Sequence, residues 1–147
     1  MKQKIILSLL LLFVVIQFFQ PSQHNNTTEA TQSFADNVPV GNILKKACND
    51  CHSNYTHYPW YSKVQPAGWY LQNHVNEGRS ELNFDSLLSY TAKRQDHKLE
   101  EIIEVLELGE MPLSSYTLLH PEAKLDSAEK QILMNWAKEM RIKLNYQ

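Results

Sequence analysis

The stretch "KKACNDCHSNYTHYPWYS", residues 45–62, contains both cysteines of this 147-residue chain, Cys48 and Cys51. Two residues separate them, and His52 follows directly. Cys-x-x-Cys-His is the attachment motif of c-type haem. Two thiols three positions apart on a tight turn can reach two vinyl groups on one edge of a porphyrin, and the adjacent imidazole then becomes the proximal iron ligand. The pattern predicts haem c, covalently attached through Cys48 and Cys51, with His52 on the iron.

Other kinds of site use the same residue types. A structural zinc site needs four ligands, and His57 and His74 would complete the set only at an unfavourable spacing. A thioredoxin-like dithiol lies where a strand meets a helix, whereas a helical pattern precedes Cys48 here. Chance occurrence of the pentapeptide is the remaining alternative. The export signal described next and the lack of further cysteines count against it, so haem c is the favoured interpretation.

The N-terminus has the pattern of a secretory signal or signal anchor. Lys2 and Lys4 precede an apolar run, residues 5–19, as in both kinds of segment. As a helix this run reaches roughly 22 Å, short of a bilayer core of about 30 Å, which favours a cleaved signal. However, no small-x-small cleavage site follows Phe19. We therefore favour an uncleaved anchor, with the remaining chain exported to the periplasm or another extracytoplasmic space.

Three segments are expected. Residues 1–21 form the signal sequence or anchor, residues 22–37 form a polar, flexible linker, and residues 38–147 form one haem-binding domain. Without Lys2 and Lys4 the chain has 12 basic against 16 acidic residues, a net charge of −4. Such a surface gives no reason to expect a nucleic acid partner.

The folded part is predicted to be all-α, because apolar residues recur at helical spacing and no segment alternates with period two. Gly78 and Gly109 are expected to end two of the helices. Asp126 and Glu129 form the sequence pattern of a capping box. The buried face of the last helix is expected to hold Ile132, Leu133, Trp136 and Met140. The predicted helices are residues 40–47, 67–77 and 95–108, and one that starts after Asp126.

The sixth iron ligand is predicted to be Met111. It precedes Pro112 in a loop after Gly109, and a loop methionine can bring its thioether to the iron without distorting a helix. His120, in the same loop, and His74 are the alternatives, and an open or water-bound iron is a third possibility. His57 is too close to His52 in sequence to pass around the ring, and His97 begins a charged helix.

Several segments together resemble a known family. They are "CNDCHSNYTHYPWYSKVQPAGW" (48–69), "VNEGRSELNF" (75–84), "GEMPLSSYTLLHPEAKL" (109–125) and "AEKQILMNWA" (128–137). The chain resembles the bacterial haem-binding domain family of small, exported, single-haem proteins, and more distantly class I cytochrome c. The resemblance implies an all-α, class I cytochrome c-like fold around one covalent haem, with His52 as proximal and Met111 as distal ligand.

The aromatic segment after the motif is expected to wall the haem. Trp60 and Tyr61 are predicted to contact it, because phenol and indole groups combine an apolar ring with a hydrogen-bonding tip. Arg79 or Lys63 is a candidate to neutralise a propionate. The alternative for the aromatic residues is simple core packing, and for Arg79 it is a surface charge.

Electron transfer is the favoured function, because an iron ligated by His52 and Met111 has no vacant site for a substrate. The expected partners are exported or membrane redox proteins and the membrane itself, and the protein is not expected to be an enzyme. The alternative function is a gas or peroxide sensor, or a peroxidase-like protein, with an open or displaceable sixth site. Haem storage, or a structural subunit of a larger complex, is a third possibility.

Overall fold

The structure, a computed structural model, describes residues 1–27, 34 and 36–145. Within these residues it is all-helical, as predicted, with seven α-helices, three short 3-10 helices and no strand. The α-helices are α1 (Lys2–Ile16), α2 (Val38–Ala47), α3 (Asn49–His52), α4 (Ala67–Glu81), α5 (Ala92–Leu108), α6 (Ser114–Leu119) and α7 (Ser127–Asn145). The 3-10 helices are η1 (Trp60–Lys63), η2 (Leu87–Ser89) and η3 (Pro121–Ala123).

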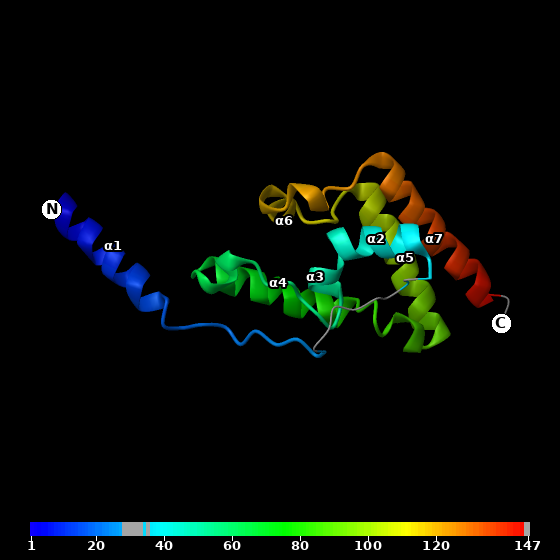
Figure 1. The fold of residues 1–147 in the computed structure, drawn as a ribbon, viewed down its shortest axis with the longest axis horizontal. Coiled ribbons are helices and arrows are strands. Elements are labelled where there is room, and N and C mark those ends of the chain that lie inside the picture. Colours follow the sequence, from blue (N-terminus) through cyan, green and yellow to red (C-terminus); the bar gives the residue numbers. More distant parts are fainter. Residues whose placement is uncertain (28–33, 35, 146–147) are drawn as a thin grey trace.

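The core lies where α2 crosses the antiparallel pair α5 and α7 (Figure 1). Each helix turns an apolar stripe inward, as its sequence period requires. Trp136 fills the centre, with its ring 4.9 Å from that of Phe34 and 6.5 Å from that of Phe84. The buried apolar residues from the three helices are Val40, Ile43, Leu44, Ala47, Leu99, Ile102, Leu106, Leu133, Trp136 and Ala137.

The helix ends follow local rules. Gly109 caps α5 in the left-handed region, at a φ of 72° that favours glycine. The predicted capping box is confirmed: the Glu129 amide donates to Asp126 Oδ1 at 2.8 Å, and the Asp126 amide donates to Glu129 Oε2 at 3.1 Å. The α5 helix begins earlier than predicted, because the Thr91 hydroxyl accepts from the Arg94 amide and caps it.

Some element predictions are wrong. Helix α4 does not end at Gly78 but continues to Glu81, since this glycine serves a close contact described below. Ile132 is 38% exposed, and Ala137 takes its place on the buried face of α7. The predicted loop 109–125 contains α6 and η3, because its prolines fall outside or at the start of these short helices.

The N-terminal helix α1 projects away from the domain (Figure 1). None of the helices in the described part of the chain has the length and apolar composition needed to cross a membrane. Residues 17–26 return along the domain and hydrogen-bond to residues 54–65. Residues 22–26 of the predicted linker therefore lie against the domain, and residues 28–33 and 35 of that linker lie outside the described residues.

Candidate functional site

The Cys-x-x-Cys-His motif forms a tight turn directly after α2. Helix α2 ends at Cys48, whose φ is −127°. The four-residue helix α3 follows and carries Cys51 and His52. The Cys48 carbonyl accepts from the Cys51 amide at 3.1 Å and from the His52 amide at 2.9 Å. The turn holds the three motif residues beside the same cavity, described below.

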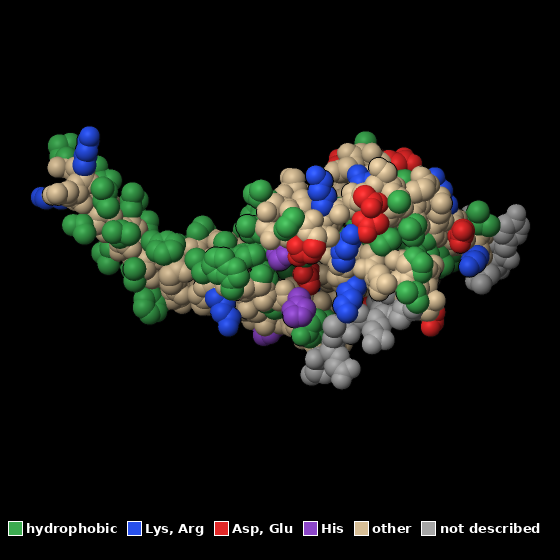
Figure 2. Space-filling model, turned by 45° about the horizontal axis from the view of Figure 1, so that its top comes forward, with side chains coloured by type: hydrophobic (Ala, Val, Ile, Leu, Met, Phe, Trp, Pro, Cys, Tyr) green, Lys and Arg blue, Asp and Glu red, His purple; other side chains and the backbone are tan. Residues whose placement is uncertain are grey.

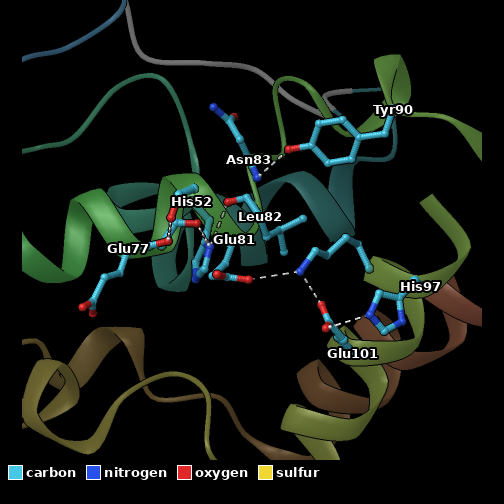
Figure 3. Close-up of polar contacts among 11 residues, drawn as sticks. His52, Glu77, Glu81, Leu82, Asn83, Tyr90, His97 and Glu101 are labelled. Carbon is cyan, nitrogen blue, oxygen red and sulfur yellow. Dashed lines mark hydrogen bonds and ion pairs between the residues drawn. The ribbon is translucent and has the colours of Figure 1, made fainter. Parts of the chain in front are cut away.

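His52 is oriented by the end of α4 (Figure 3). Its Nδ1 lies 3.0 Å from the carbonyl oxygens of both Gly78 and Leu82. Because a carbonyl can only accept, Nδ1 carries the proton and Nε2 keeps its lone pair. Burial is the main effect that lowers the pKa of His52, so the ring is neutral at neutral pH. Neutral imidazole with the second nitrogen held by a carbonyl is the arrangement typical of a metal ligand.

Gly78 allows α4 to approach the motif closely. A Cβ at this position would lie 2.8 Å from the Cys51 carbonyl oxygen and 3.0 Å from Cys51 Cβ. Any side chain here would separate α4 from α3 and draw the Gly78 carbonyl away from His52. The glycine that the sequence suggested as a helix end is instead a packing position within the helix.

Both cysteine thiols have raised pKa values, so both stay protonated at neutral pH. Burial raises the pKa of Cys48 to about 12, with a smaller effect from Cys51. Burial, followed by the Asp50 carboxylate, raises the pKa of Cys51 to about 11. A redox dithiol requires at least one thiol with a lowered pKa. The described residues also hold no cluster of three or more Cys, His, Asp or Glu placed to bind a metal ion, so the four-ligand zinc set is not assembled in them.

Two adjoining cavities open beside the motif. The larger, about 460 Å³, lies between the motif, the end of α4 and α5, and the smaller, about 300 Å³, lies between the motif, α4 and the start of the α6 segment. Both volumes fall in the range of small-molecule and cofactor sites. The residues that line both cavities are Ala47, Cys48, His52, Glu81, Met111 and Pro112.

The larger cavity has an apolar wall and acidic residues among its lining. Leu44, Leu82, Phe84, Ile102 and Val105 contribute to the wall. Lys98 also lines it, and its Nζ lies 2.7 Å from Glu101 and 3.3 Å from Glu81. The mainly apolar lining beside Cys48 and His52, with Cys51 on the adjoining cavity, suits a haem group. The acidic lining residues are Glu81, Glu101, Glu104 and Glu110, and Glu77 lines the smaller cavity.

The structure separates the candidates for the sixth ligand. Met111 lines both cavities with His52, and His74 lines the smaller one. His120 lines neither: its Nε2 lies 2.9 Å from the Tyr61 hydroxyl, and its Nδ1 lies 3.2 Å from Glu122. His57 is exposed, and the Nε2 of exposed His97 lies 3.2 Å from Glu101. Met111 as ligand stays a prediction.

Of the two predicted aromatic contacts, Tyr61 shares a cavity with the motif and Trp60 does not. Tyr61 lines a cavity of about 100 Å³ together with Cys51 and His74. Trp60 is 81% exposed and lines none of the cavities named here. Arg79 donates to the Ser53 carbonyl and the Thr56 hydroxyl, both at 2.7 Å, and also to the His24 carbonyl and Asn25 Oδ1. Its hydrogen bonds therefore go to the loop after the motif and to residues 24–25.

Sequence reasoning missed three contributors to the site. The carbonyls of Gly78 and Leu82 hold His52, and a backbone carbonyl leaves no side-chain signal in a sequence. Tyr116 lines the smaller cavity and donates to Asp50 at 2.7 Å. Burial is the main effect that raises the pKa of Tyr116, and the position of Tyr116 in a segment between two prolines gave no indication of this role.

A comparison with family models identifies the family of this chain. The model of the haem-binding domain family matches residues 11–139. The comparisons with curated proteins and with solved structures returned no match. The family match spans α2 to most of α7, and it also includes the last six residues of α1 and residues 17–26. The chain therefore belongs to the haem-binding domain family.

Proposed function

We propose that this protein is an exported electron carrier with one covalent c-type haem, attached through Cys48 and Cys51 and ligated by His52 and Met111. The single observation that carries the proposal is the state of His52. Two carbonyls fix its Nδ1 proton, and no described residue hydrogen-bonds to its Nε2, beside cavities that Met111 also lines. A haem held there supplies reversible one-electron chemistry.

The surroundings support electron transfer over acid–base catalysis. The larger cavity has a mainly apolar wall, and its one cation, Lys98, is engaged by Glu81 and Glu101. Acidic side chains line both cavities, and they favour an exported or membrane redox partner with a basic docking surface. The class I cytochrome c likeness of the fold and the membrane attachment through α1 belong to this proposal.

One observation favours the alternative function. His74 lines the smaller cavity beside His52 and Met111, and Tyr116 lies on the same wall. If Met111 binds the iron weakly, His74 and Tyr116 are positioned near the open site, as in a gas sensor or a peroxidase-like protein.

An absorption spectrum tests the proposal. The full chain is produced with c-type haem maturation, and spectra are recorded oxidised and then reduced under carbon monoxide. We expect the weak near-infrared sulfur-to-iron band, its loss in Met111→Ala, and no carbon monoxide binding by the wild type. Met134→Ala, a methionine of α7 packed against the core, is the matched control and should keep the band.

Covalent attachment is tested in parallel. Haem should remain with the chain after denaturation in the wild type and should be lost in a Cys48→Ala, Cys51→Ala double variant. A missing near-infrared band together with ready carbon monoxide binding would refute His/Met ligation and favour the sensor or peroxidase-like function.

A further inference from the structure

The apolar N-terminal helix is joined to the domain by a series of side-chain amides. The Gln65 amide donates to Gln17 Oε1 at 2.8 Å, and Gln17 Nε2 donates back to the Gln65 carbonyl at 3.1 Å. Gln20 Nε2 donates to the Lys63 carbonyl at 3.2 Å, and Gln23 Nε2 donates to the Ser62 carbonyl at 3.1 Å. These glutamines recur every third residue, and all three bond to residues 62–65 of the domain. We call residues 17–26 the strap.

The C-terminal end of the strap, residues 24–26, is also hydrogen-bonded to the domain. The Asn25 side chain accepts from the Thr56 amide at 2.8 Å and donates to the Thr56 carbonyl at 3.2 Å. The Asn26 amide donates to the Asn54 carbonyl at 2.8 Å. Arg79 donates to the His24 carbonyl at 2.6 Å. The segment after α1 is thus bonded to the domain surface from Gln17, the residue that follows α1, to Asn26.

Exposed aromatic side chains gather at the place where α1 leaves. Trp69 Nε1 donates to the Phe19 carbonyl at 2.6 Å, which sets the start of α4 against the end of α1. Phe18 is 83% exposed and Trp60 81% exposed, and Tyr70 is also open to solvent. We call Phe18, Phe19, Trp60, Trp69 and Tyr70 the aromatic end. Tyr70 bonds to Ser115 of α6 and lines a small cavity with Leu119, and Leu118, the residue before it in α6, is exposed.

This apolar surface continues into α1. Figure 2 shows hydrophobic side chains along the N-terminal helix and on the nearest part of the domain, and the starts of α4 and α6 lie at the end that α1 reaches (Figure 1). The large apolar residues of α1 from Ile5 to Val15 are all exposed, on every side of the helix. Nothing in the described part of the chain covers them.

Charge separates the two ends of the domain. Residues 51–76 contain no Asp or Glu, and their only lysine or arginine is Lys63. Carboxylates line the cavities instead, namely Asp50, Glu77, Glu81, Glu101, Glu104 and Glu110. Trp and Tyr, with an apolar body and a polar tip, are the side chains enriched where lipid meets water. A surface without carboxylates also avoids repulsion from anionic headgroups.

We propose that the aromatic end rests on the lipid surface into which α1 inserts, and that the strap holds the haem domain against that surface. The inference rests on the proposed membrane attachment. Helix α1 alone reaches roughly 22 Å at 1.5 Å per residue, and the aromatic end extends the apolar surface beyond it. The acidic cavities lie toward the other end of α4: Gly78 is roughly 14 Å along the helix from Trp69. The site therefore remains open to a partner while the domain is seated.

Spin labels on the full, haem-loaded chain test the proposal. Cys48 and Cys51 are consumed by the haem, so a single introduced cysteine takes the label, and the chain without one is the control for stray labelling. Leu118→Cys places a label beside the aromatic end, and Ser80→Cys places one on an exposed position near the other end of α4. The protein is reconstituted in vesicles of phosphatidylethanolamine and phosphatidylglycerol, and each label's accessibility to oxygen and to a water-soluble nickel chelate is measured.

We expect the label at 118 to be more accessible to oxygen than to nickel, and the label at 80 to show the reverse. Gln20→Ala removes the bonds to Lys63 and Gln65 and should shift the label at 118 toward water while the protein stays with the vesicles. Vesicle-bound protein with both labels in water would overturn the proposed contact between the aromatic end and the lipid surface, but not the membrane attachment.

Protein that does not bind vesicles would overturn both, while the absorption spectrum would still test the haem function separately. Protection of the label at 118 without lipid, with the chain dimeric in solution, would assign the surface to a second copy and overturn the lipid assignment.

Discussion

Replacing Gly78 with alanine tests the close contact between α4 and the haem motif. The new Cβ would lie 2.8 Å from the Cys51 carbonyl oxygen and 3.0 Å from Cys51 Cβ. Both neighbours belong to α3 and are held by its backbone bonds, so neither can rotate away as a flexible side chain would. Helix α4 must shift instead, and its Gly78 carbonyl moves away from His52 Nδ1.

Two effects of opposite sign decide how much Gly78→Ala changes the free energy of unfolding. Alanine in a helix interior is favoured over glycine by about 1 kcal/mol. Forcing a methyl group into a filled contact destabilises by about 1–3 kcal/mol, and two contacts at or below 3.0 Å place this site in the upper part of that range. We therefore expect Gly78→Ala to lower the free energy of unfolding by about 1–2 kcal/mol.

Urea unfolding of the haem-loaded protein measures this change, provided that the dependence on urea concentration is the same in both proteins. Ser80→Ala is the control, because position 80 is exposed on the same helix and gains helix propensity without a clash. A Gly78→Ala protein as stable as Ser80→Ala, or more stable, would show that α4 does not need to approach α3 so closely.

Three further perturbations have defined outcomes. Gly109→Ala should destabilise by about 1 kcal/mol in urea unfolding, because its φ of 72° disfavours a side chain while the nearest atom to a Cβ, 3.8 Å away, leaves room for one. Arg79→Ala should lower stability by about 2–3 kcal/mol, since its guanidinium donates to two carbonyls and a hydroxyl, and Arg79→Lys should not restore it; full recovery with lysine would contradict the need for the planar fork. The hydrogen bond from Arg141 is the main effect that lowers the pKa of Asp96, so Asp96 stabilises the fold above its ordinary pKa of 3.8 and loses this contribution as the pH falls. Asp96→Asn should therefore be less stable than the wild type at pH 7, by less than about 1 kcal/mol for a pair in partial contact with solvent, and equal to it near pH 2, as measured by thermal unfolding.

Local rules made much of this fold predictable. The spacing of Val40, Ile43, Leu44 and Ala47 identified α2 and its buried face, because that face depends on residues one turn apart. Asp126 and Glu129 marked the start of α7 for the same reason, since a capping box closes within four residues. The Cys-x-x-Cys-His motif is also local, because its three side chains lie on one short turn.

Contacts between distant residues were not predictable. Gly78 has the same sequence signal whether it ends a helix or admits another helix, and only the position of Cys51, far away in sequence, decides between the two. Residues 22–26 have the composition of a flexible linker, since amide side chains solvate well, yet the amides of Gln23 and Asn25 bond to the backbone of Ser62 and Thr56 once that loop is ordered.

The sequence by itself determined most of the helices, the Cys-x-x-Cys-His spacing of the motif and the family. Each depends on residues within a turn or two of one another, or on matches along the whole chain. The tertiary structure decided which carbonyls orient His52, that Met111 and His74 share cavities with it while His120 bonds to Tyr61, and where the strap lies. These depend on which surfaces meet when the helices pack, and no short stretch of sequence contains both partners of such a contact.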